Sequence, residues 1–171
     1  MFSADRSRAE TGAAYAAGEV METKNLIFIG QRGVGKTTLI QVLCGEELHY
    51  HKTQTVQVKA HIIDTPGEFL ERRSMNRHLL VSSYDADMVV LVEEATAEQM
   101  FFPPGFTAMF PLPAIGVITK IDLQPDYTRA KKRLEYAGAK TIFPISCTTK
   151  EGVPELAAYL KEFGYELTME L

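Results

Sequence analysis

The segment Gly30-Gln31-Arg32-Gly33-Val34-Gly35-Lys36-Thr37 decides the fold of this chain. It has the spacing G-x-x-x-x-G-K-[ST] of a phosphate-binding loop, and Thr38 continues it into a helix-forming stretch. An apolar run at 26–29 precedes it, so the loop would join a buried strand to a helix. The backbone N–H groups of such a loop turn inward around a polyphosphate, and the helix dipole reinforces them. The alternative is a glycine turn in an ordinary α/β domain, which three further motifs disfavour.

Two side chains of the loop, and a second motif, predict contacts to a nucleotide and its metal. Lys36 is expected to reach the β- and γ-phosphates as the main catalytic cation, and the Thr37 hydroxyl is expected to bind Mg²⁺. Asp64-Thr65-Pro66-Gly67 closes a second apolar strand, 28 residues after Lys36. This D-x-x-G pattern places a carboxylate near Mg²⁺ and a glycine amide near the γ-phosphate. Asp64 is therefore a predicted metal ligand and Gly67 a predicted phosphate contact.

The segment Thr119-Lys120-Ile121-Asp122 ends a third apolar strand and resembles the guanine-reading motif N-K-x-D of GTPases. The resemblance implies that Asp122 accepts two hydrogen bonds that guanine offers and adenine does not, so GTP and GDP are expected and ATP is disfavoured. Lys120 is expected to lay its aliphatic stem along the base. Thr119 departs from the usual Asn and keeps only a hydroxyl. The alternative is a strand end followed by a solvated turn.

Ser146-Cys147-Thr148 follows a fourth strand, where GTPases carry a short loop whose backbone amide meets the guanine carbonyl. Ser146 and Cys147 are therefore further predicted base contacts. Without the other motifs, this tripeptide would predict no function. In this order and with these spacings, the four motifs together predict a nucleotide-binding site.

The resemblance to GTPases also suggests catalytic candidates. Thr53 is the threonine expected over Mg²⁺ when the γ-phosphate is present, and Thr55 is the alternative. Glu68 follows D-x-x-G, where glutamine often orients the attacking water; it is either a general base with a raised pKa or a solvent-facing residue. Arg32 is either a cation for the transition state or a solvated arginine. The same two readings apply to the pair Arg72-Arg73.

Composition excludes several classes of function. Hydrophobic residues make up 46% of the 171 residues and the net charge is −4, so neither disorder nor binding to nucleic acid is expected. No apolar stretch approaches the length of a membrane span, so no membrane association is expected. Cys44 and Cys147 match no metal or disulfide spacing, which suits the reducing cytoplasm.

From residue 24 onward, strand, loop and helix alternate. This predicts an α/β fold of the P-loop NTPase (Ras-like GTPase) type, a doubly wound, mostly parallel sheet with nucleotide at the carboxyl ends of its strands. Only ten residues separate Thr53 from Asp64, so the strands expected at 54–58 and 60–63 should form a shortened edge hairpin. A fifth strand is expected at 88–92. Helices are expected near 37–44, 70–84, 126–138 and 151–163.

The expected domain organisation is a single domain at 23–165, a flexible lead at 1–22 and a short tail at 166–171. A targeting helix is the alternative reading of the first 20 residues.

Three short segments resemble one family: Lys52-Thr53-Gln54, the D-T-P-G-E run at 64–68, and F-P-P-G-F at 102–106. On these the chain is identified as a member of the EutP/PduV family, and it is more similar to the propanediol-type branch. The resemblance covers nearly all of 24–163. It implies a protein of ethanolamine- or propanediol-type metabolism, associated with a bacterial microcompartment and its shell or cargo proteins. It also implies the acetate kinase activity reported for some members.

Two side-chain runs have alternative readings. Residues 100–110 carry four Phe and two Met around two prolines, so they cannot form one regular helix. They are expected either to cover the sheet or to form a patch for a shell protein, an enzyme or a second copy of the chain. Lys131-Lys132-Arg133 is expected to be a solvated helix face, and Tyr159 and Phe163 are expected in the core.

Three functions are left open by the sequence. The first is a GTP-binding, slowly hydrolysing switch serving a microcompartment. The second is a phosphotransferase that moves the terminal phosphate to a small carboxylate such as acetate. The third is a nucleotide-binding adaptor without significant turnover.

Overall fold

The computed structural model describes residues 24–49 and 53–167. The expected lead at 1–22 and residues 168–171 of the expected tail lie outside this description. Six strands form one sheet in the order β2-β3-β1-β4-β5-β6, in which all neighbours are parallel except β2 and β3. The strands are β1 (Leu26–Ile29), β2 (Gln57–Lys59), β3 (Ile62–Asp64), β4 (Met88–Glu94), β5 (Ala114–Thr119) and β6 (Thr141–Pro144). The predicted mostly parallel α/β sheet is confirmed.

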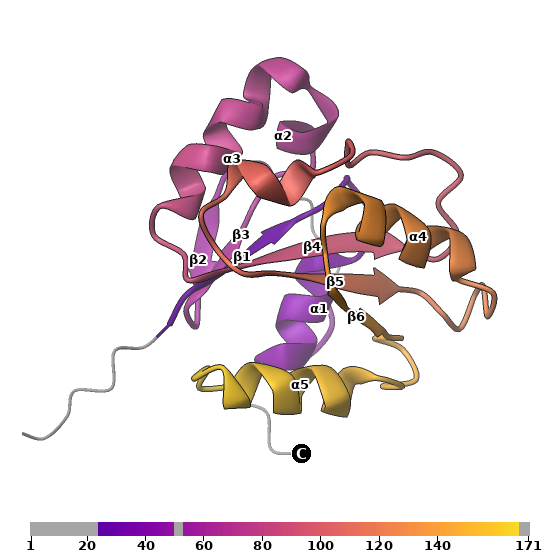
Figure 1. Cartoon of the computed structure of the whole chain (residues 1–171). Helices are drawn as coiled ribbons and strands as arrows, with labels where there is room; N and C mark the ends of the chain where they lie inside the picture. The colour runs from indigo at the N-terminus through magenta and orange to yellow at the C-terminus, as the bar shows by residue number, and fades with distance from the viewer. Residues whose placement is uncertain (1–23, 50–52, 168–171) are drawn as a thin grey trace, which may run out of the picture.

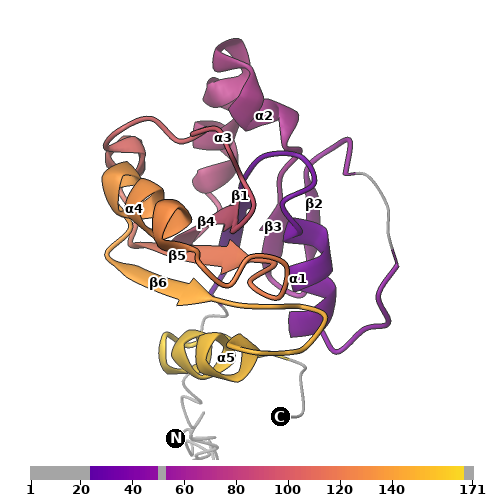
Figure 2. The same cartoon turned by 90° about the vertical axis from the view of Figure 1, so that its right-hand side faces the viewer.

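Helices cover both faces of this sheet, as Figures 1 and 2 show. The α-helices are α1 (Lys36–Leu43), α2 (Glu68–Glu71), α3 (Asn76–Ser83), α4 (Thr128–Ala137) and α5 (Val153–Glu162), and the 3₁₀ helices are η1 (Arg73–Met75) and η2 (Phe106–Met109). Residues of α1 and α5 share one apolar cluster, and residues of α3, α4 and η2 share another on the opposite face. Because both faces are covered, β1 and most of β4 are buried on both sides, which explains their continuous apolar sequences.

The edge hairpin formed by β2 and β3 is short, as predicted, with three residues in each strand. Ala60 and His61 form its turn and have φ of 44° and 62°. Two successive left-handed residues are typical of a type I′ turn, which matches the twist of a two-stranded hairpin. The turn begins directly after Lys59, which pairs with Ile62, so the strands cannot extend further at this end. All three residues of β2 are exposed.

The single helix expected at 70–84 is wrong. The chain forms α2, η1 and α3 instead, because Arg72 has extended backbone with φ −109° and ψ 111°. Leu70 and Leu79 are both buried in the same apolar cluster. They are nine residues apart, which at 3.6 residues per turn would place them on opposite sides of a continuous helix. The break at Arg72 allows both side chains to reach the core.

The aromatic run at 100–110 covers the sheet, as one of the two readings predicted. Phe102, Phe106 and Phe110 are buried, with centroid distances of 5.3 and 5.5 Å between successive rings. Met100 remains half exposed. Tyr159 and Phe163 are half-buried against the cluster formed by α1 and α5.

The expectation of a solvated face at 131–133 is wrong for Arg133. Lys131 and Lys132 are exposed, but the Arg133 side chain is 14% exposed and forms an ion pair with the 4%-exposed side chain of Glu93, 2.8 Å long. Its guanidinium also donates to the carbonyls of Ala97 and Glu98. Arg133 therefore ties α4 to the segment that follows β4.

Candidate functional site

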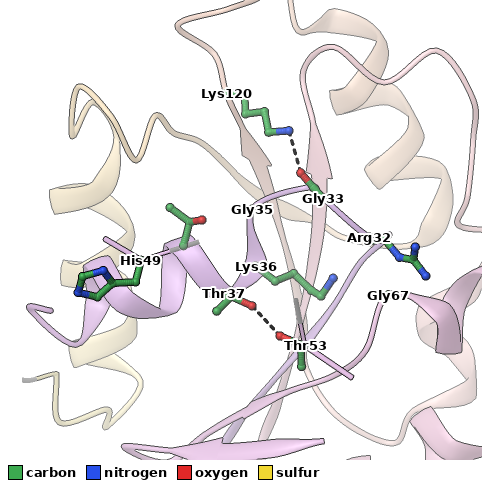
Figure 3. Close-up of a pocket in the computed structure, with 10 residues that line it drawn as sticks. Arg32, Gly33, Gly35, Lys36, Thr37, His49, Thr53, Gly67 and Lys120 are labelled. Carbon is green, nitrogen blue, oxygen red and sulfur yellow. Dashed lines mark hydrogen bonds between the residues drawn. The ribbon is translucent and has the colours of Figure 1, made fainter. Parts of the chain in front are cut away.

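A cavity of about 240 Å³ lies at the carboxyl ends of the strands, above the start of α1 (Figure 3). Its lining residues come from the phosphate loop, the chain after α1, the D-x-x-G segment and the end of β5. They are Arg32, Gly33, Gly35, Lys36, Thr37, Thr38, His49, Thr53, Gly67 and Lys120. Nine of these were sequence-predicted site residues, and they come together in one place.

The phosphate loop has the backbone that its glycines predict. Gly35 has φ of 94° and immediately precedes α1, a conformation that is costly for any residue with a Cβ. The Lys36 ammonium donates to the carbonyls of Gly30 and Gln31, at 2.7 and 2.9 Å, and the residue is 6% exposed. Burial lowers the pKa of Lys36 to about 8, while the carboxylates of Asp64 and Glu71 act in the opposite direction. A polyanion bound in this loop would stabilise the charged ammonium.

Three oxygen atoms meet where the sequence predicts a metal site. Thr37 Oγ1, Thr53 Oγ1 and Asp64 Oδ2 lie 2.7 to 2.8 Å from one another. Two hydroxyl groups supply two protons, whereas three contacts of this length would require three if each were a hydrogen bond. Asp64 Oδ1 is also buried and lacks a hydrogen-bond partner among the residues that the structure describes.

This oxygen set fits Mg²⁺. Magnesium prefers oxygen ligands, and in nucleotide sites it takes one or two carboxylates together with phosphates and water. In the described ranges, no group of three or more His, Cys, Asp or Glu is arranged to hold a metal. A metal held here would therefore depend on the two threonines, Asp64 and the phosphates of a ligand.

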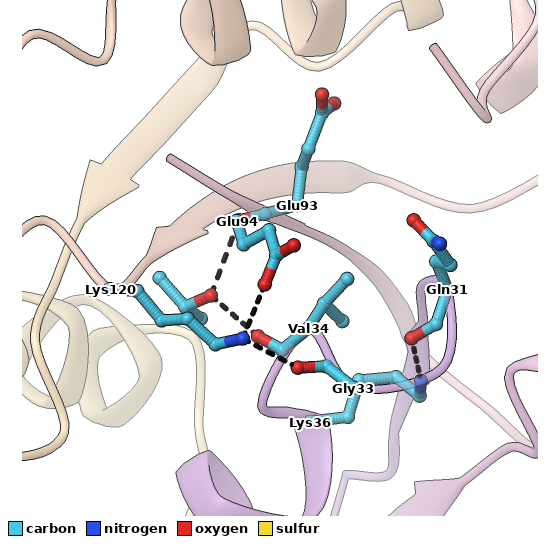
Figure 4. A network of polar contacts seen from close by, with 8 residues as sticks. Gln31, Gly33, Val34, Lys36, Glu93, Glu94 and Lys120 are labelled. Carbon is cyan, nitrogen blue, oxygen red and sulfur yellow. Dashed lines mark hydrogen bonds and ion pairs between the residues drawn. The ribbon is translucent and has the colours of Figure 1, made fainter. Parts of the chain in front are cut away.

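The motif at the end of β5 is tied to the phosphate loop, as Figure 4 shows. The Thr119 hydroxyl donates to the carbonyl of Val34 at 2.5 Å. Lys120 Nζ donates to the carbonyl of Gly33 at 2.8 Å and forms an ion pair with Glu94 at the end of β4. Although Thr119 replaces the usual Asn, its hydroxyl supplies a direct link between the two motifs.

The loop after β6 lies beside Asp122. The Ile121 N–H donates to the carbonyl of Ile145 at 3.3 Å, which joins the ends of β5 and β6. Ser146 is fully buried, and its Oγ accepts from the Thr149 N–H, so its side chain shapes the loop. Asp122 itself is exposed.

Cys147 is half-buried, and burial raises the pKa of its thiol to about 11; the Lys150 charge acts in the opposite direction, and the Asp122 carboxylate adds to the rise. The thiol is therefore neutral at physiological pH. A contact between the Cys147 backbone amide and a guanine base stays a prediction.

The D-x-x-G segment packs closely against the phosphate loop. A Cβ added to Gly67 would lie 2.2 Å from the backbone nitrogen of Arg32, so the approach requires glycine. The Arg32 guanidinium forms an ion pair with Glu68, and the Arg32 N–H donates to Glu71 Oε1 at 3.0 Å. Glu68 therefore does not simply point to solvent. Arg72 and Arg73 are exposed.

Sequence reasoning missed His49, Glu71 and Glu94 in this site. The backbone of His49 is held by both ends of the Gln41 side-chain amide, at 2.9 and 3.2 Å. Gln41 lies on α1 and is buried. A glutamine within the apolar run 39–43 was the sequence signal that could have indicated a polar contact here. Glu71 and Glu94 stand in segments read only for their apolar pattern, and nothing in that pattern identifies their partners.

Sequence comparison finds a matching family model and several similar proteins. Residues 23–162 match the family model described as "Ethanolamine utilisation - propanediol utilisation". The propanediol utilization protein PduV of Citrobacter freundii is 40% identical over 139 residues, which cover 80% of this chain and 93% of that protein. The probable acetate kinase EutP of Salmonella typhimurium is 30% identical over 141 residues, which cover 80% and 89%. The chain is thus more similar to this PduV than to this EutP.

Solved structures confirm the P-loop GTPase fold. The GDP-bound structure of Methanosarcina barkeri Roco2 RocCORdC matches with a TM-score of 0.56 and 19% identity, covering 82% of this chain and 48% of that one. Translation elongation factor SelB of Methanococcus maripaludis, in complex with the GTP analogue GppNHp, matches with a TM-score of 0.60 and 22% identity, covering 85% and 35%. No helix in the described part of the chain is long and apolar enough to cross a membrane. With the family model spanning residues 23–162, the chain belongs to the PduV-EutP family.

Proposed function

We propose that this protein binds GTP and GDP with Mg²⁺ and hydrolyses GTP slowly, as a nucleotide-dependent switch. The observation that carries the proposal is the hydrogen bond from the Thr119 hydroxyl to the Val34 carbonyl. It joins the segment expected to read the base to the segment expected to hold the phosphates. One ligand carrying both a guanine and a polyphosphate would contact both segments.

The catalytic residues support a slow rate. Arg32, the candidate cation for the transition state, is paired with Glu68, the residue that stands in place of the usual glutamine. A paired arginine contributes less positive charge to a developing phosphate charge. Unassisted GTPases turn over at roughly 10⁻⁴ to 10⁻² s⁻¹, and this range is expected here.

The family supports a biological setting for this function. Its printed description names ethanolamine and propanediol utilisation, and its relatives carry the same association in their names. We infer that the protein acts in the cytoplasm beside a microcompartment of this metabolism, with shell or cargo proteins or a second copy of the chain as partners. Nucleic acid and membrane are not expected partners, because the net charge is −4 and most of the large apolar side chains that the structure describes lie in the core.

A second candidate function is transfer of the terminal phosphate to a small carboxylate. A relative at 30% identity is named a probable acetate kinase. A further cavity of about 400 Å³ adjoins the phosphate loop through Glu71, and Arg73 and Asn76 contribute to its wall. An arginine beside such a cavity could bind the carboxylate of an acceptor.

The test is nucleotide turnover by the full chain, with GTP or ATP, with and without acetate. Phosphate release and acetyl phosphate are measured separately, and Lys36→Ala is the control for contaminating activity. A slow GTP rate indifferent to acetate and lost in Lys36→Ala supports the switch. Turnover near 1 s⁻¹ that yields acetyl phosphate and GDP or ADP would replace the switch by the kinase. Tight GTP binding without turnover would favour the third function, a nucleotide-binding adaptor.

A further inference from the structure

Glu71 places a carboxylate directly on the phosphate loop. Its Oε1 accepts a hydrogen bond of 3.0 Å from the backbone N–H of Arg32, although 39 residues separate the two in sequence. Arg32 lies within the loop and lines the cavity described above, beside Gly67 in Figure 3. The backbone amides of such a loop are the groups that hold phosphate oxygens. The Glu71 carboxylate thus occupies a backbone amide of the kind that binds the phosphate oxygens of a nucleotide.

Two more observations place the Glu71 charge within this site. Its carboxylate acts on Lys36 through space and favours the charged ammonium, so Glu71 lies near the main phosphate-binding cation. The backbone at Gly67, four residues before Glu71, contacts the phosphate loop so closely that a Cβ at Gly67 would clash with the Arg32 nitrogen. The short helix α2 therefore holds Glu71 over the loop, while the neighbouring Glu68 pairs with the Arg32 guanidinium.

We propose that Glu71 is an internal anion that competes with the terminal phosphate of a bound nucleotide and thereby sets the preference between GTP and GDP. The inference rests on the proposed function. The γ-phosphate and the carboxylate are both anions, so they repel each other where they approach the same donors. GDP lacks the γ-phosphate and leaves Glu71 on Arg32. GTP displaces Glu71 and carries α2 with it.

The competition also couples the terminal phosphate to a movable element. The helix α2 has four residues and ends at the extended residue Arg72, so it can shift without unwinding α3. The hydrogen bond to Glu71 would be lost whenever the γ-phosphate is bound. Loss of the γ-phosphate on hydrolysis would let it form again, and α2 would return to the loop.

The experiment measures the dissociation constants of GDP and of a non-hydrolysable GTP analogue, by direct titration of the full chain at constant Mg²⁺. The variants are Glu71→Gln, which removes the charge and keeps an acceptor for the Arg32 N–H, and Glu71→Ala, which removes both. The matched control is Glu135→Gln on α4, an exposed site with the same change of charge. Thermal unfolding of each variant verifies that it is folded.

Glu71→Gln is expected to tighten binding of the GTP analogue by about threefold to tenfold and to change GDP binding less than about twofold. The change in affinity for the GTP analogue should be at least as large for Glu71→Ala. The difference between Glu71→Gln and the native chain should shrink at high salt, because Glu71 is exposed. Glu135→Gln should leave the ratio of the two constants unchanged.

Two failures are distinguishable. If the native chain binds both guanine nucleotides but neither Glu71 variant changes their ratio, the inference is wrong and the proposed function stands. If the native chain binds no guanine nucleotide, the proposed function is wrong and the inference is overturned with it.

Discussion

Thr119 and Val34 are joined by a hydrogen bond of 2.5 Å from the threonine hydroxyl to the valine carbonyl, across 85 residues of sequence. Thr119 is 1% exposed and Val34 is 2% exposed, so the bond is shielded from water. The side chain of Thr119 is shorter than the asparagine of the N-K-x-D motif, yet its hydroxyl reaches the phosphate loop. The bond links the segment expected to read the base to the segment expected to hold the phosphates.

Removing this hydroxyl should loosen the site. Thr119→Val keeps the shape of the side chain but deprives the buried Val34 carbonyl of this donor, which is expected to lower the free energy of unfolding by about 1–3 kcal/mol. Nucleotide affinity should fall as well, because the base and phosphate segments are no longer held together. Thr119→Ser keeps the hydroxyl and is the matched control. Denaturant unfolding and nucleotide titration of both variants give the answer, and equal stability of Thr119→Val and the native chain would contradict it.

Nucleotide choice should depend on Asp122. The native chain is expected to bind GTP and GDP at least tenfold more tightly than ATP, about 1.4 kcal/mol. Asp122→Asn should erase this preference, because the amide cannot accept both hydrogen bonds from guanine. Competition titrations with the three nucleotides measure it. Equal affinity of the native chain for ATP and GTP would refute the guanine assignment.

Nucleotide affinity should decline at alkaline pH because of Lys36. Its pKa is lowered to about 8, so above that pH the free protein loses the ammonium that phosphate binding requires. Affinity is expected to fall by up to about tenfold per pH unit from about pH 8 to pH 9, with uptake of a proton on binding. Lys36→Arg keeps its charge throughout this range. Its affinity, even if weaker, should therefore not show this decline.

The lowered pKa of Lys36 affects the free energy of unfolding in the opposite direction to nucleotide affinity. The unfolded chain holds the Lys36 proton more tightly than the folded chain between pH 8 and 10.5. The contribution of Lys36 to the free energy of unfolding therefore rises with pH across that window. Calorimetry in buffers of different ionisation enthalpy separates the proton uptake on nucleotide binding from the proton uptake on unfolding. A pH-independent affinity in the native chain would contradict the assignment of the titrating group.

Breaking the buried ion pair between Arg133 and Glu93 should destabilise the fold. Arg133→Leu leaves the Glu93 carboxylate buried and unpaired, and a loss of about 3–5 kcal/mol in the free energy of unfolding is expected. Replacing Glu93 by Leu in the same chain should restore a large part of it, because no buried charge then remains. Lys132→Leu, one residue away and exposed, is the control and should change stability little. An Arg133→Leu protein as stable as this control would show that the pair is unimportant.

The sheet and the phosphate loop could be predicted from the sequence because each has a local signal. Buried parallel strands are continuously apolar, and the spacing of glycines and Lys36 follows from the shape that wraps a polyphosphate. The D-x-x-G and base motifs lie at strand ends, and the carboxyl ends of neighbouring parallel strands meet at one edge. Their convergence at the cavity therefore followed from the order of the strands.

The polar partners could not be predicted, since they come from contacts between distant segments. Arg133 pairs with a residue 40 positions away, and Arg32 binds Glu71 at a separation of 39. Both glutamates at the two ends of α2 have the same chemistry, and only the break at Arg72 and the packing of Gly67 decide which one meets the backbone of the loop. That break depends in turn on burial of Leu70 and Leu79, which is a property of the assembled core.

The three-residue strand β2 also affects how readily this edge of the sheet can pair with another chain. An edge strand exposes unpaired backbone groups, and a long, flat, apolar one recruits other chains. Here the edge carries the exposed side chain of Val58, yet it ends after three residues in a tight left-handed turn. So short a row offers an incoming strand few main-chain hydrogen bonds, and Lys59 and Gln57 flank Val58 with polar side chains. The shortened hairpin therefore limits self-association through this edge of the sheet.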